Sequence, residues 1–317
     1  MIFWPLLILA FVSVKTMAEQ MLPSRGLVYS QQQLLSHIKT LASDDFSGRE
    51  TATRGNEKAR VYIIDALKQL DVAPLGQTYR HSFSYKGDAD GANVIGFIPG
   101  TEFPQQYIVL SAHFDHIGQD ARVIYNGADD NASGTAALLS IAEQVKQAPL
   151  RYSLILLFTD GEEVGLVGAH AFIRSYQELI VKIKLNINLD MIAGDRKTKK
   201  LRFISKDMDT LLDDRALKMW AALRQSGEIP VKKGFRSGVG NISRSKSVVN
   251  NRIRWRAASD HYVFYKADIP FIYFGVGTHK NYHTGRDDFN GINQEFYLAA
   301  TASICRQIYL LDRLMLN

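Results

Sequence analysis

The feature that most constrains the fold is a series of short apolar runs separated by segments of a different periodicity. Five runs are rich in Ile, Val and Leu and are only six or seven residues long, a pattern typical of buried strands. They are Asn93–Ile98, Tyr107–Ala112, Ser153–Thr159, Ile183–Leu189 and Ile269–Phe274. Runs of this length predict a sheet that is covered on both faces.

Apolar residues recur at helical spacing between and around these runs. The predicted helices are Leu34–Leu41, Glu57–Leu70, Gly134–Gln147, Asp207–Arg224 and Gln294–Met315. Ser133 is the expected N-cap of the helix that begins at Gly134. Strands that alternate with helices imply a three-layer α/β/α fold with a mixed, largely parallel central sheet.

The N-terminus carries an uninterrupted apolar run, Ile2–Val14. Its 13 residues are fewer than the roughly 17–25 that a membrane-spanning helix needs. Thr16-Met17-Ala18 places small residues where a signal peptidase reads them, so we predict a signal peptide over 1–18 and an exported, periplasmic or secreted domain over 19–317. No Lys or Arg precedes the run, and an uncleaved anchor or a buried N-terminal segment is the alternative.

Two compositional features limit the function classes. Cys305 is the only cysteine, which excludes a disulfide within the chain.

The basic excursion 196–256 holds 17 Lys/Arg against 5 Asp/Glu in a chain of net charge +6. We interpret it as a solvated segment, with a contact surface for anionic partners as the alternative. Because no nucleic-acid recognition motif accompanies the charge, we expect no nucleic-acid partner.

Acids and histidines follow the predicted strands, at the edge where α/β sheets bind ligands. His113 and Asp115 follow the second strand, Glu162 and Glu163 the third, and Asp190 the fourth. Two further groups lie in 126–131, before a helix, and in 282–288, after the last strand. No cysteine is among them, so the pattern favours a metal that accepts imidazole and carboxylate, with zinc first.

Each group taken alone has an ordinary explanation. A His-x-Asp or an adjacent Glu pair is more often solvated, and Asp-Asp-Asn before a helix is often only a cap. The joint placement of the groups at strand ends is what favours a metal site. His116 has no assignment from this pattern, and we interpret it as a structural histidine, with a substrate contact as the alternative.

The sequence resembles the co-catalytic di-zinc aminopeptidases, the family of secreted bacterial leucyl aminopeptidases, from about Leu34 to the C-terminus. The segments that match are Leu41–Arg49, His113–Asp115, Gly127–Gly134, Asp160–Gly165, Asn188–Asp190, Ser259–His261 and Tyr282–Thr284. The resemblance implies a zinc aminopeptidase-like fold that binds two Zn²⁺ ions per chain.

The resemblance also implies a role for each matching residue. Five residues would hold the ions: His113 and Asp190 on one, Glu163 and His283 on the other, and Asp129 bridging both. Glu162 would be the catalytic general base. The resemblance further implies a cis peptide bond between Asp129 and Asp130.

Three more acids are expected to support the ligands. Asp115 lies two residues after His113, on the same side of an extended chain, and can accept the imidazole N–H. Asp287 could do the same for His283. Asp260 resembles the acid of the family's Ser-Asp-His segment and would be structural or substrate-orienting.

These residues predict a metal-dependent exopeptidase that acts on peptides with a free N-terminus. A carboxypeptidase, a deacylase or a glutaminyl cyclase-like enzyme could use the same frame, although His113 argues against the last. A non-catalytic binding domain is a further alternative, but such relatives should lose ligands or the base. The absence of Gly-x-Ser-x-Gly and of His-Glu-x-x-His disfavours a serine hydrolase and a single-zinc protease.

Overall fold

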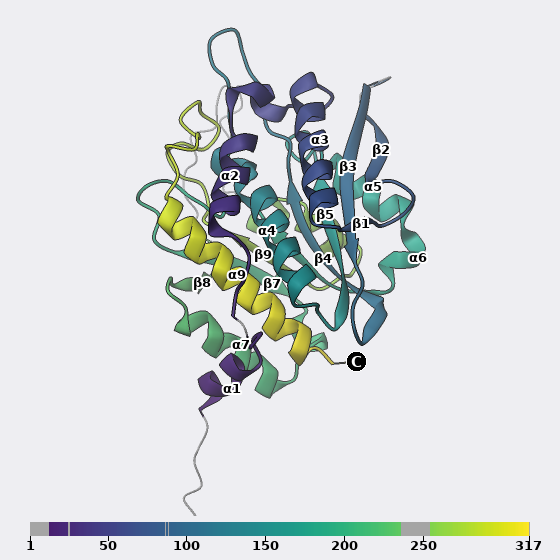
Figure 1. Cartoon of the computed structure of the whole chain (residues 1–317), viewed down its shortest axis with the longest axis vertical. Helices are drawn as coiled ribbons and strands as arrows, with labels where there is room; N and C mark the ends of the chain where they lie inside the picture. The colour runs from purple at the N-terminus through teal and green to yellow at the C-terminus, as the bar shows by residue number, and fades with distance from the viewer. Residues whose placement is uncertain (1–12, 25, 86, 88, 236–253, 317) are drawn as a thin grey trace, which may run out of the picture.

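A mixed sheet forms the middle layer of the computed structural model (Figure 1). The structure describes residues 13–24, 26–85, 87, 89–235 and 254–316. Within them the strand order is β1-β3-β5-β4-β6-β9-β7-β8, and β2 also pairs with β3. The strands are β1 Ala73–Pro74, β2 Arg80–Tyr85, β3 Ala89–Ile98, β4 Phe103–His113, β5 Tyr152–Thr159, β6 Ile183–Leu189, β7 Leu201–Lys206, β8 Val231–Lys233 and β9 Phe271–Gly275.

Parallel pairing is confined to the centre of the sheet and to one edge. The neighbours β5, β4, β6 and β9 are parallel, as are β7 and β8, whereas β1, β2 and β5 pair antiparallel with β3, and β7 pairs antiparallel with β9. The predicted mixed sheet is confirmed, with its parallel part at the centre. The carboxyl ends of four central strands therefore meet at one edge.

Helices cover both faces of the sheet. The α-helices are α1 Val14–Gln20, α2 Gln31–Leu41, α3 Arg54–Gln69, α4 Gly134–Gln147, α5 Val167–Ser175, α6 Gln177–Ile180, α7 Asp214–Ser226, α8 His261–Lys266 and α9 Gln294–Leu314. Helices α2, α3, α4 and α9 lie over one face (Figure 1), while α5 and α8 contact the other. The predicted three-layer architecture is confirmed.

The central strands are apolar throughout because each face meets a hydrophobic core. In β5, Leu154 and Leu156 pack into the core beneath α2, α3, α4 and α9. Ile155 and Leu157 pack into the smaller core beneath α5 and α8. The alternation of side chains along a strand thus serves two cores instead of one core and solvent.

The start of α7 and the N-cap of α4 differ from the sequence prediction. Helix α7 begins at Asp214, not Asp207, because Asp213 caps it by accepting the Ala216 N–H at 2.7 Å. Helix α4 begins at Gly134 as predicted, but Ser133 does not cap it. Asn131 Oδ1 accepts the Gly134 N–H at 3.0 Å instead, while Ser133 Oγ donates to the backbone oxygen of Asp129.

The N-terminal apolar run falls mostly in residues 1–12, outside the described residues. Only Ser13 and Val14 of the run are described, and they cap and begin α1, which contacts α7 and buries Ala18 completely. Throughout the described ranges, no helix is both long enough and apolar enough to cross a bilayer. The predicted cleavage after Ala18 stays a prediction.

The basic excursion contributes to the fold over its described part, residues 196–235 and 254–256. It supplies β7, α7 and β8, and it buries Phe203, Trp220 and Leu223. Arg224 lies over the Trp220 ring at 3.9 Å from its centroid. Residues 236–253 lie outside the described ranges.

Candidate active site

Two clusters of acids and histidines lie at the carboxyl edge of the central strands. In the first, His113 ends β4, Glu162 follows β5 and Asp190 follows β6. The second combines His116, Asp130, Glu163 and His283. Within each cluster, one ligand atom from every residue lies within 4.8 Å of the others. The structure therefore places five predicted residues in two neighbouring clusters at the carboxyl ends of the strands, as expected: His113, Glu162, Glu163, Asp190 and His283.

Asp130 lies between the clusters. Its Oδ1 is 3.4 Å from His113 Nε2, and its Oδ2 is 3.0 Å from His283 Nε2. Asp190 Oδ1 is 3.5 Å from His113 Nε2, and Glu163 Oε2 is 3.3 Å from His283 Nε2. Zinc ligands about 2.0–2.1 Å from the ion in a tetrahedron lie roughly 3.3 Å apart. The spacing of these atoms therefore matches that of zinc ligands.

Asp129, predicted as the bridging acid, points elsewhere. Its Oδ1 accepts the backbone N–H groups of Ala193 and Gly194 at 2.7 and 2.8 Å. Its Oδ2 lies 2.8 Å from His279 Nε2. The predicted placement of Asp129 between the clusters is therefore wrong: its oxygens are engaged by these donors, and Asp130 occupies that place.

The predicted cis peptide bond is displaced by one residue as well. It joins Asp130 to Asn131, not Asp129 to Asp130. The cis bond therefore joins Asp130, which lies between the clusters, to Asn131. The Asn131 side chain donates to the Leu189 backbone oxygen at 2.9 Å and so connects this turn to the end of β6.

Among the described residues, three buried atoms of the two clusters make no hydrogen bond of good geometry: Asp190 Oδ1, His116 Nε2 and His283 Nε2. His283 Nε2 nevertheless lies close to the carboxylates of Asp130 and Glu163. Leaving such atoms unpaired costs about 1–3 kcal/mol each, a cost that a bound ion removes from those that coordinate it. Imidazole and carboxylate donors at these spacings are a zinc donor set, so the residues fit a pair of zinc ions.

The clusters are buried and rich in carboxylates, and this shifts their pKa values. Burial raises the pKa of Glu162 well above its usual value, and Glu163 and Asp190 add to the shift although His113 opposes it. Burial lowers the pKa of His283, but Asp130 and Glu163 outweigh it and raise the pKa to about 11.

Asp115 supports the site differently from the prediction. Its carboxylate accepts the backbone N–H groups of Glu162 and Glu163 at 3.2 and 3.3 Å. His113 Nδ1 lies 3.1 Å from the backbone oxygen of Asp115 but 3.7 Å from its carboxylate. The backbone of Asp115 thus orients the His113 ring, while its side chain holds the Glu162-Glu163 turn.

Asp287 also has other partners than the predicted one. Its two oxygens accept the backbone N–H groups of Asp129 and Asp130 at 2.9 and 3.0 Å, not the His283 imidazole. Burial, with Asp129 adding to it, raises the pKa of Asp287 to about 6. Asp287 therefore fixes the turn that presents Asp130 to both clusters.

Asp260 is fully buried beside the first cluster. It accepts a hydrogen bond from the Thr159 hydroxyl. Burial raises the pKa of Asp260 to about 7, His113 lowers it, and Asp190 contributes to the rise. These contacts are those of a structural acid at the end of β5, and a substrate-orienting role stays a prediction.

Sequence reasoning gave no role to two residues that hold the site. His279 Nδ1 accepts the Asn281 N–H at 3.2 Å, so its Nε2 carries the proton that faces Asp129. Arg49 is buried and donates to the backbone oxygens of Leu41, Phe114, Asn126 and Gly127. Contacts with backbone atoms leave no pattern in a sequence, although Arg49 lies in the upstream matching segment.

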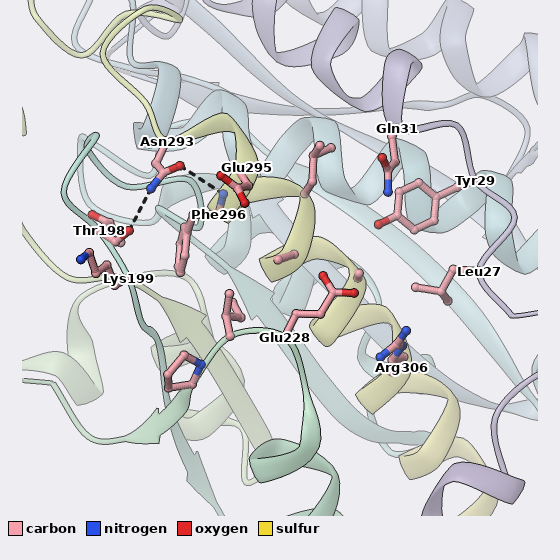
Figure 2. A pocket seen from close by; sticks show the side chains of 15 residues that line it. Leu27, Tyr29, Gln31, Thr198, Lys199, Glu228, Asn293, Glu295, Phe296 and Arg306 are labelled. Atoms are coloured by element: carbon pink, nitrogen blue, oxygen red, sulfur yellow. Dashed lines mark hydrogen bonds between the residues drawn. The ribbon is translucent and has the colours of Figure 1, made fainter.

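A hollow of about 640 Å³ lies away from these clusters, against α9 (Figure 2). Tyr29, Glu228 and Arg306 are among its lining residues, and none of the lining residues belongs to either cluster. The hollow is therefore separate from the site that the acids and histidines form.

A comparison with protein-family models identifies the chain. Residues 93–308 match the model of Peptidase family M28. The chain belongs to peptidase family M28. This M28 chain is 31% identical to the alkaline phosphatase isozyme conversion protein of Escherichia coli over half of each protein. It is 25% identical to aminopeptidase YwaD of Bacillus subtilis over 82% of this chain and 53% of YwaD.

Solved structures share the fold of this M28 chain. The zinc aminopeptidase BSAP of Bacillus subtilis aligns with a TM-score of 0.68 at 14% identity, over 90% of this chain and 96% of BSAP. The LapA aminopeptidase of Legionella pneumophila aligns with a TM-score of 0.65 at 18% identity, over 94% and 74%. The M28 chain spans about half the length, or less, of the curated relatives that it matches first.

Proposed function

We propose that this M28 chain is a di-zinc aminopeptidase, which hydrolyses the N-terminal peptide bond of peptides with a free amine. The observation that carries the proposal is the position of Asp130, which turns one oxygen toward each cluster. A carboxylate in this position can bind two cations and offset their mutual repulsion. Relatives named as aminopeptidases support the choice of substrate.

Five residues would hold the ions. His113, Asp130 and Asp190 would bind one zinc ion, and Asp130, Glu163 and His283 the other. When bound, the ions would polarise the scissile carbonyl and lower the pKa of a coordinated water. A carboxylate-rich, buried site also attracts the cationic α-amine of a substrate, which favours cleavage at the N-terminus.

Glu162 would act as the general base. It belongs to the first cluster, but His113, Asp130 and Asp190 already have the spacing of zinc ligands without it. Glu162 is therefore free for another role. Burial and the surrounding acids raise the pKa of Glu162, which makes its ionised carboxylate a stronger base. In that form Glu162 would take a proton from water and deliver it to the departing amine. Asp115 would hold the Glu162-Glu163 turn during this transfer.

A substrate panel tests the reaction and its end-selectivity. We expect the zinc-loaded chain to cleave aminoacyl nitroanilides and C-amidated peptides, and to leave the N-acetylated counterparts intact. Rapid cleavage of the acetylated compounds would contradict the proposal and favour a deacylase. If cleavage instead requires a free C-terminal carboxylate, the proposal is contradicted and a carboxypeptidase is favoured. The glutamate carboxypeptidase 2 homolog of Caenorhabditis elegans, which is 35% identical over 111 residues, carries that class in its name.

We also propose that the protein is exported to the periplasm or secreted, with cleavage after Ala18. The apolar run Ile2–Val14 and the small residues Thr16 and Ala18 support this proposal. N-terminal sequencing of the protein from its native host tests it. A mature chain that starts at Glu19 is expected, and one that retains Met1 would contradict cleavage.

A further inference from the structure

His116 is the one member of the second cluster to which the proposed reaction gives no role. Its side chain is fully buried, and its Nδ1 lies 2.8 Å from Glu163 Oε1. The other oxygen of Glu163, Oε2, lies 3.3 Å from His283 Nε2. The two oxygens of Glu163 therefore face two different histidines.

The position of the His116 ring is fixed by close packing. A Cβ atom at Gly127, where φ is +53°, would lie 2.5 Å from His116 Cδ2, so only glycine leaves room for the ring. The ring also meets His283 edge to face, with 5.5 Å between centroids. Packing against Gly127 and His283 therefore keeps the His116 ring in contact with Glu163.

The contact with Glu163 also sets where the His116 proton lies. An ionised carboxylate only accepts hydrogen bonds, so Nδ1 must carry the proton that joins the two groups. The 2.8 Å separation is typical of a hydrogen bond to an ionised oxygen. Asp130 Oδ2, at 3.7 Å from Nδ1, is too distant to be the main acceptor.

We propose that His116 is a positioning residue for the second metal cluster. Its Nδ1–H engages Oε1 of Glu163, so that Oε2 alone faces His283. The carboxylate would then bind metal through one oxygen in a fixed orientation. This inference rests on the proposed function, in that the second cluster holds zinc.

Replacing the donor should weaken zinc binding at one cluster. Removing such an outer partner of a ligand typically costs about 10–100-fold in metal affinity. His116→Phe keeps the ring volume but has no N–H, and His116→Ala serves as a second donor-free variant. His116→Asn places an amide N–H near the position of Nδ1, but it lacks an imidazole that could bind zinc.

The experiment is a zinc titration of the metal-free full chain against a chromogenic chelator. We expect His116→Phe and His116→Ala to lose about 10–100-fold in affinity for one zinc and to keep the other. His116→Asn should bind both ions with nearly wild-type affinity. The control is His37→Asn, because His37 Nδ1 contacts the Tyr62 hydroxyl at 2.7 Å, outside both clusters, and it should change neither affinity.

Two results would overturn the inference. Wild-type affinities in both donor-free variants would show that the His116 hydrogen bond is dispensable. Weakening in His116→Asn equal to that in His116→Phe would show that the imidazole binds zinc directly. A wild-type chain that binds no zinc would overturn the proposed function as well, which separates that failure from the failure of this inference alone.

Discussion

Asp129 and Asp130 are neighbours in the chain, but their carboxylates serve different parts of the structure. Asp130 turns its oxygens toward His113 and His283, at 3.4 and 3.0 Å. Asp129 accepts the Ala193 N–H at 2.7 Å and so fixes the turn after Asp190. In the proposed site, Asp130 would bind metal and Asp129 would hold the backbone around it.

Asparagine substitutions should separate these two roles. Asp130→Asn leaves a single carbonyl oxygen where two ions need one each, so the variant should lose at least one of two zinc ions. Asp129→Asn should retain both, and it should lower the free energy of unfolding by about 1–3 kcal/mol because a buried acceptor is altered. Elemental analysis and denaturant unfolding measure these outcomes. Full zinc content in Asp130→Asn would contradict the assignment.

Glu162→Gln should separate metal binding from turnover. The amide cannot take a proton from water, so kcat should fall by about 10²–10⁴-fold. Zinc content should stay at the wild-type level because the five proposed ligands are unchanged. Steady-state kinetics on an aminoacyl nitroanilide, with metal analysis of the same sample, checks both parts. Unchanged kcat would exclude Glu162 as the base.

Zinc binding should release protons. Burial lowers the pKa of His283, but Asp130 and Glu163 raise it to about 11, so the ring is protonated in the metal-free chain near neutral pH. An imidazole that binds zinc must be neutral, so zinc affinity should rise with pH across the neutral range and up to about pH 11. Calorimetry in buffers of different ionisation enthalpy counts the protons. Affinity independent of pH would contradict the protonated metal-free site.

The buried ion pair between Arg60 and Asp160 should be important for stability. Arg60 Nη2 lies 3.1 Å from Asp160 Oδ2, and their side chains are 5% and 0% exposed. Arg60→Met leaves the acid without its cation, so the free energy of unfolding should fall by about 3–5 kcal/mol. The control is Lys68→Met on the same helix, which removes an exposed pair with Asp65 and should cost under about 1 kcal/mol. Equal effects of the two changes in denaturant unfolding would contradict the prediction.

The sequence predicted the parts of the fold that depend on long apolar patterns. The five buried runs correspond to β3, β4, β5, β6 and β9. The short strands β1 and β8 have two and three residues, too few for a periodicity to be read. The RHSFSY of β2 is mainly polar and shows no apolar run, because Phe83 is the one buried residue of this strand.

The candidate site could be predicted as far as strand ends determine it. His113, Glu163 and Asp190 follow parallel neighbours, so the fold alone brings them together. The choice between Asp129 and Asp130 depends on the backbone direction of one turn, and two adjacent acids give the same sequence signal. The partners of Asp287 are backbone N–H groups, which no residue pattern reveals.

Zinc titration of the metal-free chain, followed by peptidase activity at each step, tests the central claim most directly. The account predicts two zinc ions per chain, held in the two clusters that share Asp130, and full activity only when both are bound. Full activity in a chain that holds no zinc, or a single ion bound at saturation, would contradict it.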